Sequence, residues 1–392
     1  MDWREMRRFW PFALNFLLFA AFASFLPFIV LYYQGLGFTG PQIGVLTGIA
    51  PLLTLFSAPL WTGLADATRR HRLLMSVSIV VGMITLLVFP LLNAFLPVLL
   101  AAVLLNVFMA PVMPFADNAT MVMLADEKEM YSRIRLGGTI GYGLAAPIAG
   151  VLVQNHGLRL AFWGSAILLL VGLVVSQKLV HGQLDADVLA RGHVRALMSN
   201  PHWILFLIVA LSGGSALAVF NMYLFPHMRE LGASESTMGL ALMVGMVSEI
   251  PALFFGNRLI KRLRGYRLLM LSMVVTGLRL LLFAASETPS LVLAIQLLNG
   301  LTFPTMWVAG VSYADERASA GMSATAQGLF SAVVLGFGTA VGGLIGGPLL
   351  ERGGGRGLYF VFGVAVLVIV TVVALIHRRL PEEKISPDGV TD

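Results

Sequence analysis

Long apolar segments recur along the whole chain, and they restrict its fold more than any other feature. A helix needs about 20 mainly apolar residues to cross the hydrocarbon core of a bilayer. Only 12% of the 392 residues are charged, whereas soluble domains carry roughly a quarter. The pattern predicts an all-α membrane protein with twelve spans. We place them at residues 9–33, 42–65, 73–93, 97–124, 134–154, 159–180, 203–228, 237–257, 267–286, 289–314, 322–349 and 357–377.

The formal charge of +6 does not indicate nucleic-acid binding, because the basic residues lie in short connections between apolar segments. Membrane proteins retain Lys and Arg on the cytoplasmic side. The asymmetry predicts a multi-pass protein of the cell inner membrane, surrounded by lipid, with both termini in the cytoplasm. The cytoplasmic side would hold Arg4, Arg7, Arg8, Arg69, Arg70, Arg72, Lys128, Arg133, Lys178, Arg191, Arg195, Arg258, Lys261, Arg262, Arg264, Arg267, Arg317, Arg378, Arg379 and Lys384, and the outer side only Arg159, Arg229, Arg352 and Arg356.

An internal duplication divides the chain near its midpoint, where the longest polar connection lies. Three pairs of segments match at one offset of 195 residues: Leu36-Gly37 with Leu231-Gly232, Arg72–Met75 with Arg267–Met270, and Gly141–Gly143 with Gly336–Gly338. The offset predicts six-helix bundles at residues 1–180 and 201–380, a cytoplasmic linker at 181–200 and a cytoplasmic tail at 381–392. Parallel repeats with a site between them near the midplane are an architecture of secondary transporters.

Sequence signals of other chemistries are missing. The chain has no cysteine, which excludes disulfides and thiolate chemistry. It has no clustered histidine ligands, no nucleophile–base spacing and no Gly-x-x-x-x-Gly-Lys-Ser/Thr loop. We therefore expect a protein that is not an enzyme, that has no catalytic residue, metal or cofactor, and that is not driven by ATP. The buried charges described next make a proton gradient its expected energy source.

Two acids and two arginines that could pair are among the charged residues inside the predicted spans, where each costs roughly 2.5–3.5 kcal/mol. Asp117 and Arg135 lie nine positions either side of Asp126, in the turn between two antiparallel helices, so they share a depth. Glu249 and Arg279 are likewise equidistant from a turn. The spacing thus predicts one acid–arginine pair in each half, for solute binding or proton coupling. The alternative is that both pairs are structural ion pairs. Arg135 has a second alternative: its long side chain could extend to the cytoplasmic headgroups.

Uncharged polar residues inside the spans give weaker signals. Asn221, Tyr223 and Trp307 are the candidates for lining a solute cavity in the second half. Hydrogen bonding between helices is the more common role of such amides and hydroxyls. Weaker candidates of the same kind are Asn15, Asn106, Gln296 and Asn299.

The segment Gly63-Leu64-Ala65-Asp66-Ala67-Thr68-Arg69-Arg70-His71-Arg72 resembles the loop signature of the major facilitator superfamily, a glycine and an aspartate followed by basic residues. The resemblance implies the major facilitator fold and a role in conformational change for Gly63, Asp66, Arg70 and Arg72. The sequence departs from the signature at Thr62 and at Arg70, where the family usually has glycine.

A second resemblance covers nearly the whole chain. Residues Tyr131–Gly141, with Arg133, Arg135 and Gly138, resemble the start of helix 5 in the lactose permease and phenylpropionate permease group. That alignment puts Asp117 and Arg135 at the group's solute-binding acid and arginine. Glu249 and Arg279 are similar to the acid and arginine of its proton-coupling network, in which Asp117 is a further candidate. The interior of the helix around Trp307 has no His or Glu, unlike members of that group.

The resemblance and the buried charges together predict proton-coupled symport by alternating access. The solute would be a small organic molecule such as an organic or aromatic acid, a glycoside or a nucleoside, taken up by a monomer. One alternative is a proton-coupled drug or metabolite exporter, because Gly143–Gly150 partly resembles an antiporter motif. The other is a non-transporting membrane receptor or scaffold.

Overall fold

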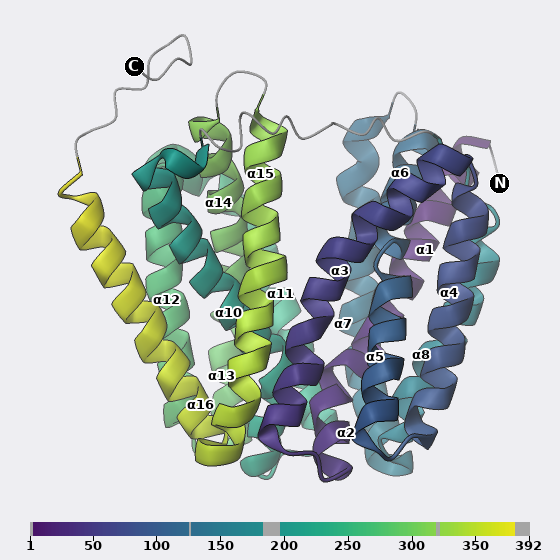
Figure 1. Ribbon diagram of the computed structural model, residues 1–392, viewed down its shortest axis with the longest axis horizontal. Helices are drawn as coiled ribbons and strands as arrows, with labels where there is room; N and C mark the ends of the chain where they lie inside the picture. The colour runs from purple at the N-terminus through teal and green to yellow at the C-terminus, as the bar shows by residue number, and fades with distance from the viewer. Residues whose placement is uncertain (1–2, 125–126, 183–196, 319–321, 381–392) are drawn as a thin grey trace.

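The apolar segments fold into helices whose bounds follow the predicted spans (Figure 1). The computed structural model describes residues 3–124, 127–182, 197–318 and 322–380. The first half contains α1 (Trp3–Phe25), η1 (Leu26–Phe28), α2 (Ile29–Gly35), α3 (Gly40–Thr68), α4 (His71–Val88), η2 (Phe89–Leu91), α5 (Phe95–Met109), α6 (Val112–Leu124), η3 (Lys128–Met130), α7 (Tyr131–His156) and α8 (Arg159–Ser176). The second half contains α10 (Pro201–Glu230), α11 (Glu235–Leu263), α12 (Gly265–Ala285), α13 (Pro289–Gln296), η4 (Asn299–Leu301), α14 (Phe303–Arg317), α15 (Ser323–Ser331), η5 (Ala332–Gly338) and α16 (Thr339–His377).

The helices account for twelve membrane crossings. Nine helical stretches of the described residues are long and apolar enough to span a bilayer, and a bent pair formed by α13 and η4–α14 adds a tenth. One of the nine, Thr325–His377, is 53 residues long, about twice what one crossing needs. It reverses at Gly354, whose φ of 61° and ψ of −170° interrupt the helix, so it crosses twice. The 29-residue α11 is the remaining span.

Three of the predicted spans are broken within the membrane, which the apolar pattern did not indicate. The first is interrupted by η1 at Leu26–Phe28, and the fourth between α5 and α6. The tenth bends by 48° between α13 and α14. Pro27, Pro111 and Pro304 lie in or directly after these breaks, as expected for a residue that removes a helical hydrogen bond.

The duplication predicted from the sequence is repeated in the backbone. Gly37 and Gly232, 195 residues apart, have φ angles of 77° and 81°. Arg69 and Arg264, at the same offset, are the two residues other than glycine with positive φ in the described part of the chain, at 56° and 61°. Left-handed conformations are uncommon outside glycine, so their recurrence at one offset confirms two pseudo-symmetric halves.

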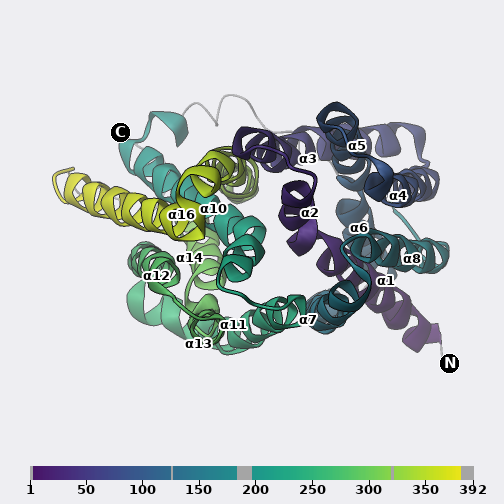
Figure 2. The same cartoon turned by 90° about the horizontal axis from the view of Figure 1, so that it is seen from below.

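The two halves meet through small residues at the end opposite the chain termini (Figures 1 and 2). On one side of this seam α3 packs against α16, and a Cβ at Gly44 would lie 2.6 Å from the Leu344 carbonyl oxygen. On the other side α7 packs against α11, where Gly239 is equally close to Ala146. Toward the termini the ribbons of the two halves diverge (Figure 1). The predicted linker at 181–200 and tail at 381–392 fall largely outside the described residues, so their bounds stay predictions.

Candidate functional site

Arg279 on α12 is a deeply buried charge, with 2% of its surface exposed. Its guanidinium donates hydrogen bonds to Asn299 Oδ1 at 2.7 Å, to Thr302 Oγ1 at 2.9 Å and to Gln296 Oε1. The Phe220 ring covers the guanidinium at 4.2 Å from its centroid. Three neutral acceptors and an aromatic face therefore fix the side chain, and the balancing negative charge has to come from farther away.

Glu249 on α11 supplies that negative charge through a bridge. Asn299 accepts from Arg279 with Oδ1 and donates from Nδ2 to Glu249 Oε1 at 2.7 Å. The predicted direct ion pair of Glu249 with Arg279 is thus wrong in its geometry, because the amide of Asn299 lies between the two groups. The two charges do contact the same amide, in agreement with the similar depth that their spacing from the helix turn indicated.

The break in the tenth span creates this bridge. Gln296 ends α13, Asn299 begins η4 and Thr302 precedes α14, so the unwound segment presents three polar side chains to one guanidinium. The neighbouring Gly300 lies against the Ser248 carbonyl of α11, where a Cβ would clash. Asn-Gly, followed by Pro304, was the local sequence signal of this turn. Thr302 was missed, because nothing in the apolar pattern marked the helix as interrupted.

Glu249 and Asn299 line a cavity between the halves. Arg279, Gln296 and Asn221 of the second half line it too, and Tyr142 on α7 contributes from the first half. The cavity encloses about 550 Å³ of empty space, part of it open to solvent. Asn221, predicted to line a solute cavity, therefore lies in the wall of this one.

Asp117 on α6 and Arg135 on α7 form the ion pair predicted for the first half. Arg135 Nη1 lies 2.8 Å from Asp117 Oδ1 and 3.0 Å from Oδ2, and it also donates to the Tyr131 hydroxyl at 3.2 Å. The side chains are 43% and 33% exposed. Exposed pairs contribute little to stability, so the fold does not depend strongly on this one.

Tyr223 and Trp307 do not line the cavity that Asn221 lines. Tyr223 is fully buried at the seam, where its hydroxyl donates to the Gly343 carbonyl at 2.8 Å and lies 3.1 Å from Thr47 Oγ1. It joins the two halves in this conformation and does not line the cavity, contrary to the prediction. Trp307 packs against Phe303 and Phe330.

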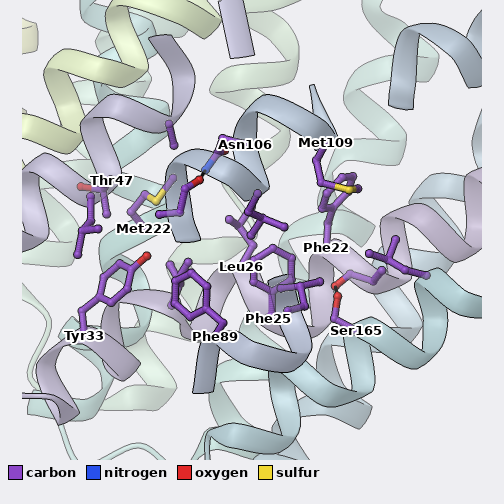
Figure 3. A pocket seen from close by; sticks show the side chains of 18 residues that line it. Phe22, Phe25, Leu26, Tyr33, Thr47, Phe89, Asn106, Met109, Ser165 and Met222 are labelled. Carbon is purple, nitrogen blue, oxygen red and sulfur yellow. Dashed lines mark hydrogen bonds between the residues drawn. The ribbon is translucent and has the colours of Figure 1, made fainter. Parts of the chain in front are cut away.

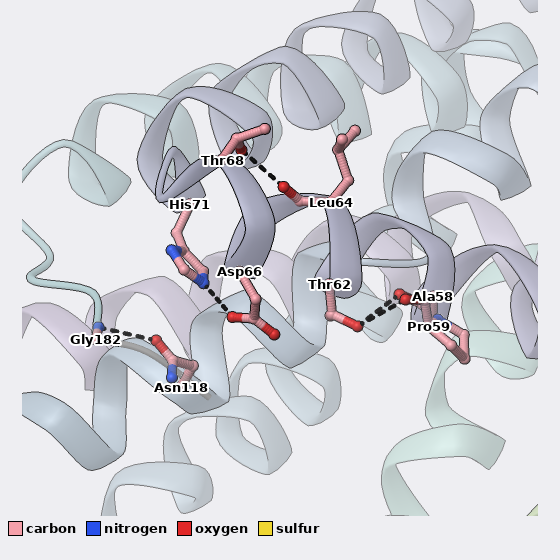
Figure 4. Close-up of polar contacts among 9 residues, drawn as sticks. All are labelled: Ala58, Pro59, Thr62, Leu64, Asp66, Thr68, His71, Asn118 and Gly182. Carbon is pink, nitrogen blue, oxygen red and sulfur yellow. Dashed lines mark hydrogen bonds and ion pairs between the residues drawn. The ribbon is translucent and has the colours of Figure 1, made fainter. Parts of the chain in front are cut away.

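The loop between α3 and α4 is held by Asp66, which contacts His71 at 2.8 Å (Figure 4). Arg72 donates to Gln177 Oε1 at the end of α8 at 3.0 Å. Arg70 is the N-cap of α4 with a φ of −113°, so the left-handed residue of the loop is Arg69 and not Arg70. A Cβ at Gly63 would meet no atom within 4 Å.

The start of the central linker docks beside this loop. The Gly182 amide donates to Asn118 Oδ1 at 3.2 Å (Figure 4). The His181 ring stacks on His71 with 6.3 Å between centroids. Burial, followed by the charges of His71 and Arg72, lowers the pKa of His181 to about 4. Among the described residues no group of three or more His, Cys, Asp or Glu could hold a metal ion.

Twelve spans in two pseudo-symmetric halves, closed at one end around a charged cavity, define a multi-pass transporter of the major facilitator fold. Residues 12–362 match the family described as the MFS_1-like family, and the chain belongs to it. Its members are transporters, which confirms that the protein is not an enzyme.

Several relatives are similar over most of the chain. The maltose permease of Geobacillus stearothermophilus is 28% identical over 367 residues, which cover 93% of each chain. Multidrug resistance protein MdtG of Rahnella sp. (strain Y9602) is 28% identical over 299 residues, 70% of each chain.

Two solved structures share the fold. Nucleoside transporter NupG superposes with a TM-score of 0.84 at 19% identity, over 96% of this chain and 100% of that one. A bacterial homolog of the human lysosomal transporter Spinster, in an inward-facing and unoccupied conformation, gives 0.70 at 14% identity, over 96% of each.

Proposed function

We propose that this transporter is a proton-coupled symporter that takes up a small hydroxyl-bearing solute, of the glycoside or nucleoside kind. The observation that carries the proposal is the contact chain Glu249–Asn299–Arg279 in the wall of the cavity between the halves. Glu249 is an ionisable group that faces the cavity, and Asn299 connects it by hydrogen bonds to the fixed, buried charge of Arg279. A protein that only scaffolds others has no need of such an arrangement in its interior.

Proton binding at Glu249 is the coupling step of this proposal. An ionised Glu249 accepts the Asn299 hydrogen bond and balances Arg279 across the amide. Protonation removes the negative charge and leaves the buried arginine without a balancing charge, which is costly. A conformational change that gives Arg279 a new partner or new solvation relieves that cost, so that proton and solute move together.

The groups that face the cavity favour hydroxyls over carboxylates. Glu249 is a hydrogen-bond acceptor that an ionised carboxylate would not approach, and Asn221 offers both a donor and an acceptor. Arg279 is 2% exposed and already bonded to three acceptors. Organic and aromatic acids are therefore less well supported than glycosides or nucleosides. The names of two similar proteins, a maltose permease and a nucleoside transporter, agree with this solute class.

In the proposed orientation both termini lie in the cytoplasm. The protein would be a monomer in the cell inner membrane. The seam would then close the outer end, and the described conformation would be open to the cytoplasm. Reporter fusions after Ser286 should be periplasmic and fusions after Asn200 cytoplasmic. A cytoplasmic reporter at Ser286 would refute the orientation.

The coupling proposal is tested in proteoliposomes with a pH indicator. Addition of methyl α-glucoside, maltose or uridine should alkalinise the medium outside wild-type vesicles as solute and protons enter together. Glu249→Gln should abolish this signal and keep solute exchange, because glutamine retains a hydrogen-bonding oxygen but binds no proton. Wild-type alkalinisation by Glu249→Gln would assign Glu249 a structural role.

Export is the second candidate, supported by the similarity to multidrug resistance protein MdtG. In everted membrane vesicles a proton antiporter accumulates its solute when the vesicle interior is acid, whereas a symporter does not. Accumulation of a cationic dye under those conditions, absent from vesicles without the protein, would favour export over uptake.

A further inference from the structure

We infer that a second pocket, inside the first half, binds an apolar group of the transported solute. The inference rests on the proposed function and adds to it an amphiphilic solute: a glycoside or nucleoside that carries an aromatic or other apolar group. Its hydroxyl-bearing end would occupy the polar cavity around Glu249. Its apolar end would lie in the first-half pocket, which Met222 of α10 helps to line.

The pocket is an apolar space of about 790 Å³ of empty volume, part of it open, among α1, α3, α4, α5 and α8 (Figure 3). Phe25 and Phe89, which line its interior, are 5% and 0% exposed. Phe22, Asn106 and Met222 also line it and are only partly buried. Met222 belongs to α10 of the second half, so the pocket extends to the interface between the two halves.

The pocket and the polar cavity are equivalent under the internal repeat. Six lining positions of one correspond to six of the other at the offset of 195 residues. The pairs are Phe22 with Leu217, Phe25 with Phe220, Leu26 with Asn221, Ile29 with Leu224, Thr47 with Leu242 and Ala50 with Gly245. Each half also contributes an amide from its fourth span, Asn106 in the first and Asn299 in the second.

The two equivalent spaces differ in chemistry. Around the polar cavity are Glu249, Arg279 and Gln296. The first-half pocket has no charged lining residue among those described; its polar groups are one amide and the hydroxyls of Tyr33, Thr47 and Ser165. Ser165 is already committed to the Ala21 carbonyl at 2.9 Å. A duplicated site has thus become one polar and one apolar subsite on either side of the same helix, α10.

The occupant follows from this division. Asn221 and Met222 are consecutive on α10 and face the polar and the apolar space respectively. A single solute lying across α10 at this point meets hydrogen-bonding groups at one end and phenylalanine rings at the other. Aromatic rings favour stacked or edge-on contact with such side chains, so an aryl group is the fitting apolar end.

The apolar character of the pocket can be tested without a solute, because the chain has no cysteine of its own. Phe22→Cys and its repeat mate Leu217→Cys are each reacted, in nanodiscs, with benzyl methanethiosulfonate and with anionic sulfonatoethyl methanethiosulfonate. The benzyl-to-sulfonatoethyl rate ratio should be about tenfold higher at Phe22→Cys, the scale of burying an aromatic group. Equal ratios at the two positions would overturn the inference.

Solute binding gives the second test, with methyl α-glucoside and phenyl α-glucoside as probes. The phenyl compound should bind wild type about tenfold more tightly than the methyl compound. Ala50→Leu, which narrows the pocket, should remove that difference, whereas Gly143→Ala, at a residue that lines neither space and whose Cβ would meet no atom within 4 Å, should retain it. Equal affinities for both probes in wild type would also overturn the inference. Failure of both glucosides to bind, with the expected thiol ratio, would refute the glycoside assignment and uphold the apolar pocket.

Discussion

Glu249 and Arg279 are connected through one amide, with Asn299 Oδ1 2.7 Å from the guanidinium and Asn299 Nδ2 2.7 Å from the carboxylate. Both charges therefore depend on a residue in the break of the tenth span. An asparagine is suited to this place because it offers an acceptor and a donor at once. A leucine or alanine offers neither.

Asn299→Ala should lower the free energy of unfolding by about 1–3 kcal/mol, because it leaves a buried guanidinium and a carboxylate each short of a partner. It should also abolish solute-driven alkalinisation. Melting temperature and the vesicle pH assay measure the two effects. Asn15→Ala is the matched control, since that side chain donates to the Pro11 carbonyl of its own helix, lines neither space and should leave proton coupling intact.

The pair Asp117–Arg135 should contribute less to stability than the Asn299 bridge between Glu249 and Arg279. With 33% and 43% of the side chains exposed, the pair should contribute only about 0–1 kcal/mol to stability. If it binds solute, Arg135→Lys should weaken solute affinity by about 2 kcal/mol, because lysine lacks the planar fork. The melting temperature should hardly change.

Solute affinity and melting temperature are measured for Arg135→Lys, Asp117→Asn and the double variant. The pair Arg8–Glu127, with 44% and 40% of its side chains exposed, is the control, and Arg8→Lys should leave affinity unchanged. Lower stability with wild-type affinity in Arg135→Lys would instead make the pair structural.

The neutral form of His181 should stabilise the docking of the linker. Its pKa is lowered to about 4 in the folded protein, against about 6.5 for a free histidine. As pH falls from about 6.5 to 4, the unfolded chain takes up the proton first, so stability decreases across this window. His181→Gln should remove that part of the acid sensitivity.

Melting temperatures between pH 7 and pH 5 provide the measurement. The melting temperature of wild type should fall more than that of His181→Gln between pH 7 and pH 5. His156→Gln, at an exposed helix end, should follow wild type. Parallel curves for wild type and His181→Gln would mean that the linker is not held by an uncharged ring.

Sequence reasoning predicted well the features that depend on counting along the chain. The twelve spans, the repeat and the shared depth of Glu249 with Arg279 all follow from residue spacing, which the helix converts directly into distance. The same counting gave the Asp117–Arg135 pair. These predictions needed no knowledge of which helix face meets which neighbour.

Features that depend on rotation and tertiary contact were missed. The bend of the tenth span arises where Gly300 packs against Ser248, a contact between residues far apart in sequence. Tyr223 was assigned to the cavity, but a polar side chain in a span can face a seam as readily as a cavity. Only the packing of α10 against α3 and α16 decides between the two.

The seam between α3 and α16 should control which end of the transporter is open. A Cβ at Gly44 would lie 2.6 Å from the Leu344 carbonyl oxygen, so Gly44→Ala overpacks this contact by about 1–3 kcal/mol. The cost falls only on the conformation in which the seam is closed. A penalty of that size shifts a two-state equilibrium by roughly 5- to 150-fold toward the state that separates the two helices.

The shift can be measured by double electron–electron resonance, which gives the distribution of distances between two spin labels. The labels are attached at Gln34→Cys and Arg352→Cys, both exposed at the seam end. Gly44→Ala should increase the long-distance population relative to the otherwise unchanged protein. Thr47→Val should do so as well, because it removes the hydrogen bonds from Thr47 to Gly343 and Tyr223. Gly143→Ala, whose Cβ would meet no atom within 4 Å, should give the unshifted distribution. If Gly44→Ala also gave that distribution, the close approach of α3 and α16 would be incidental to the conformational equilibrium, and other contacts would have to hold that end closed.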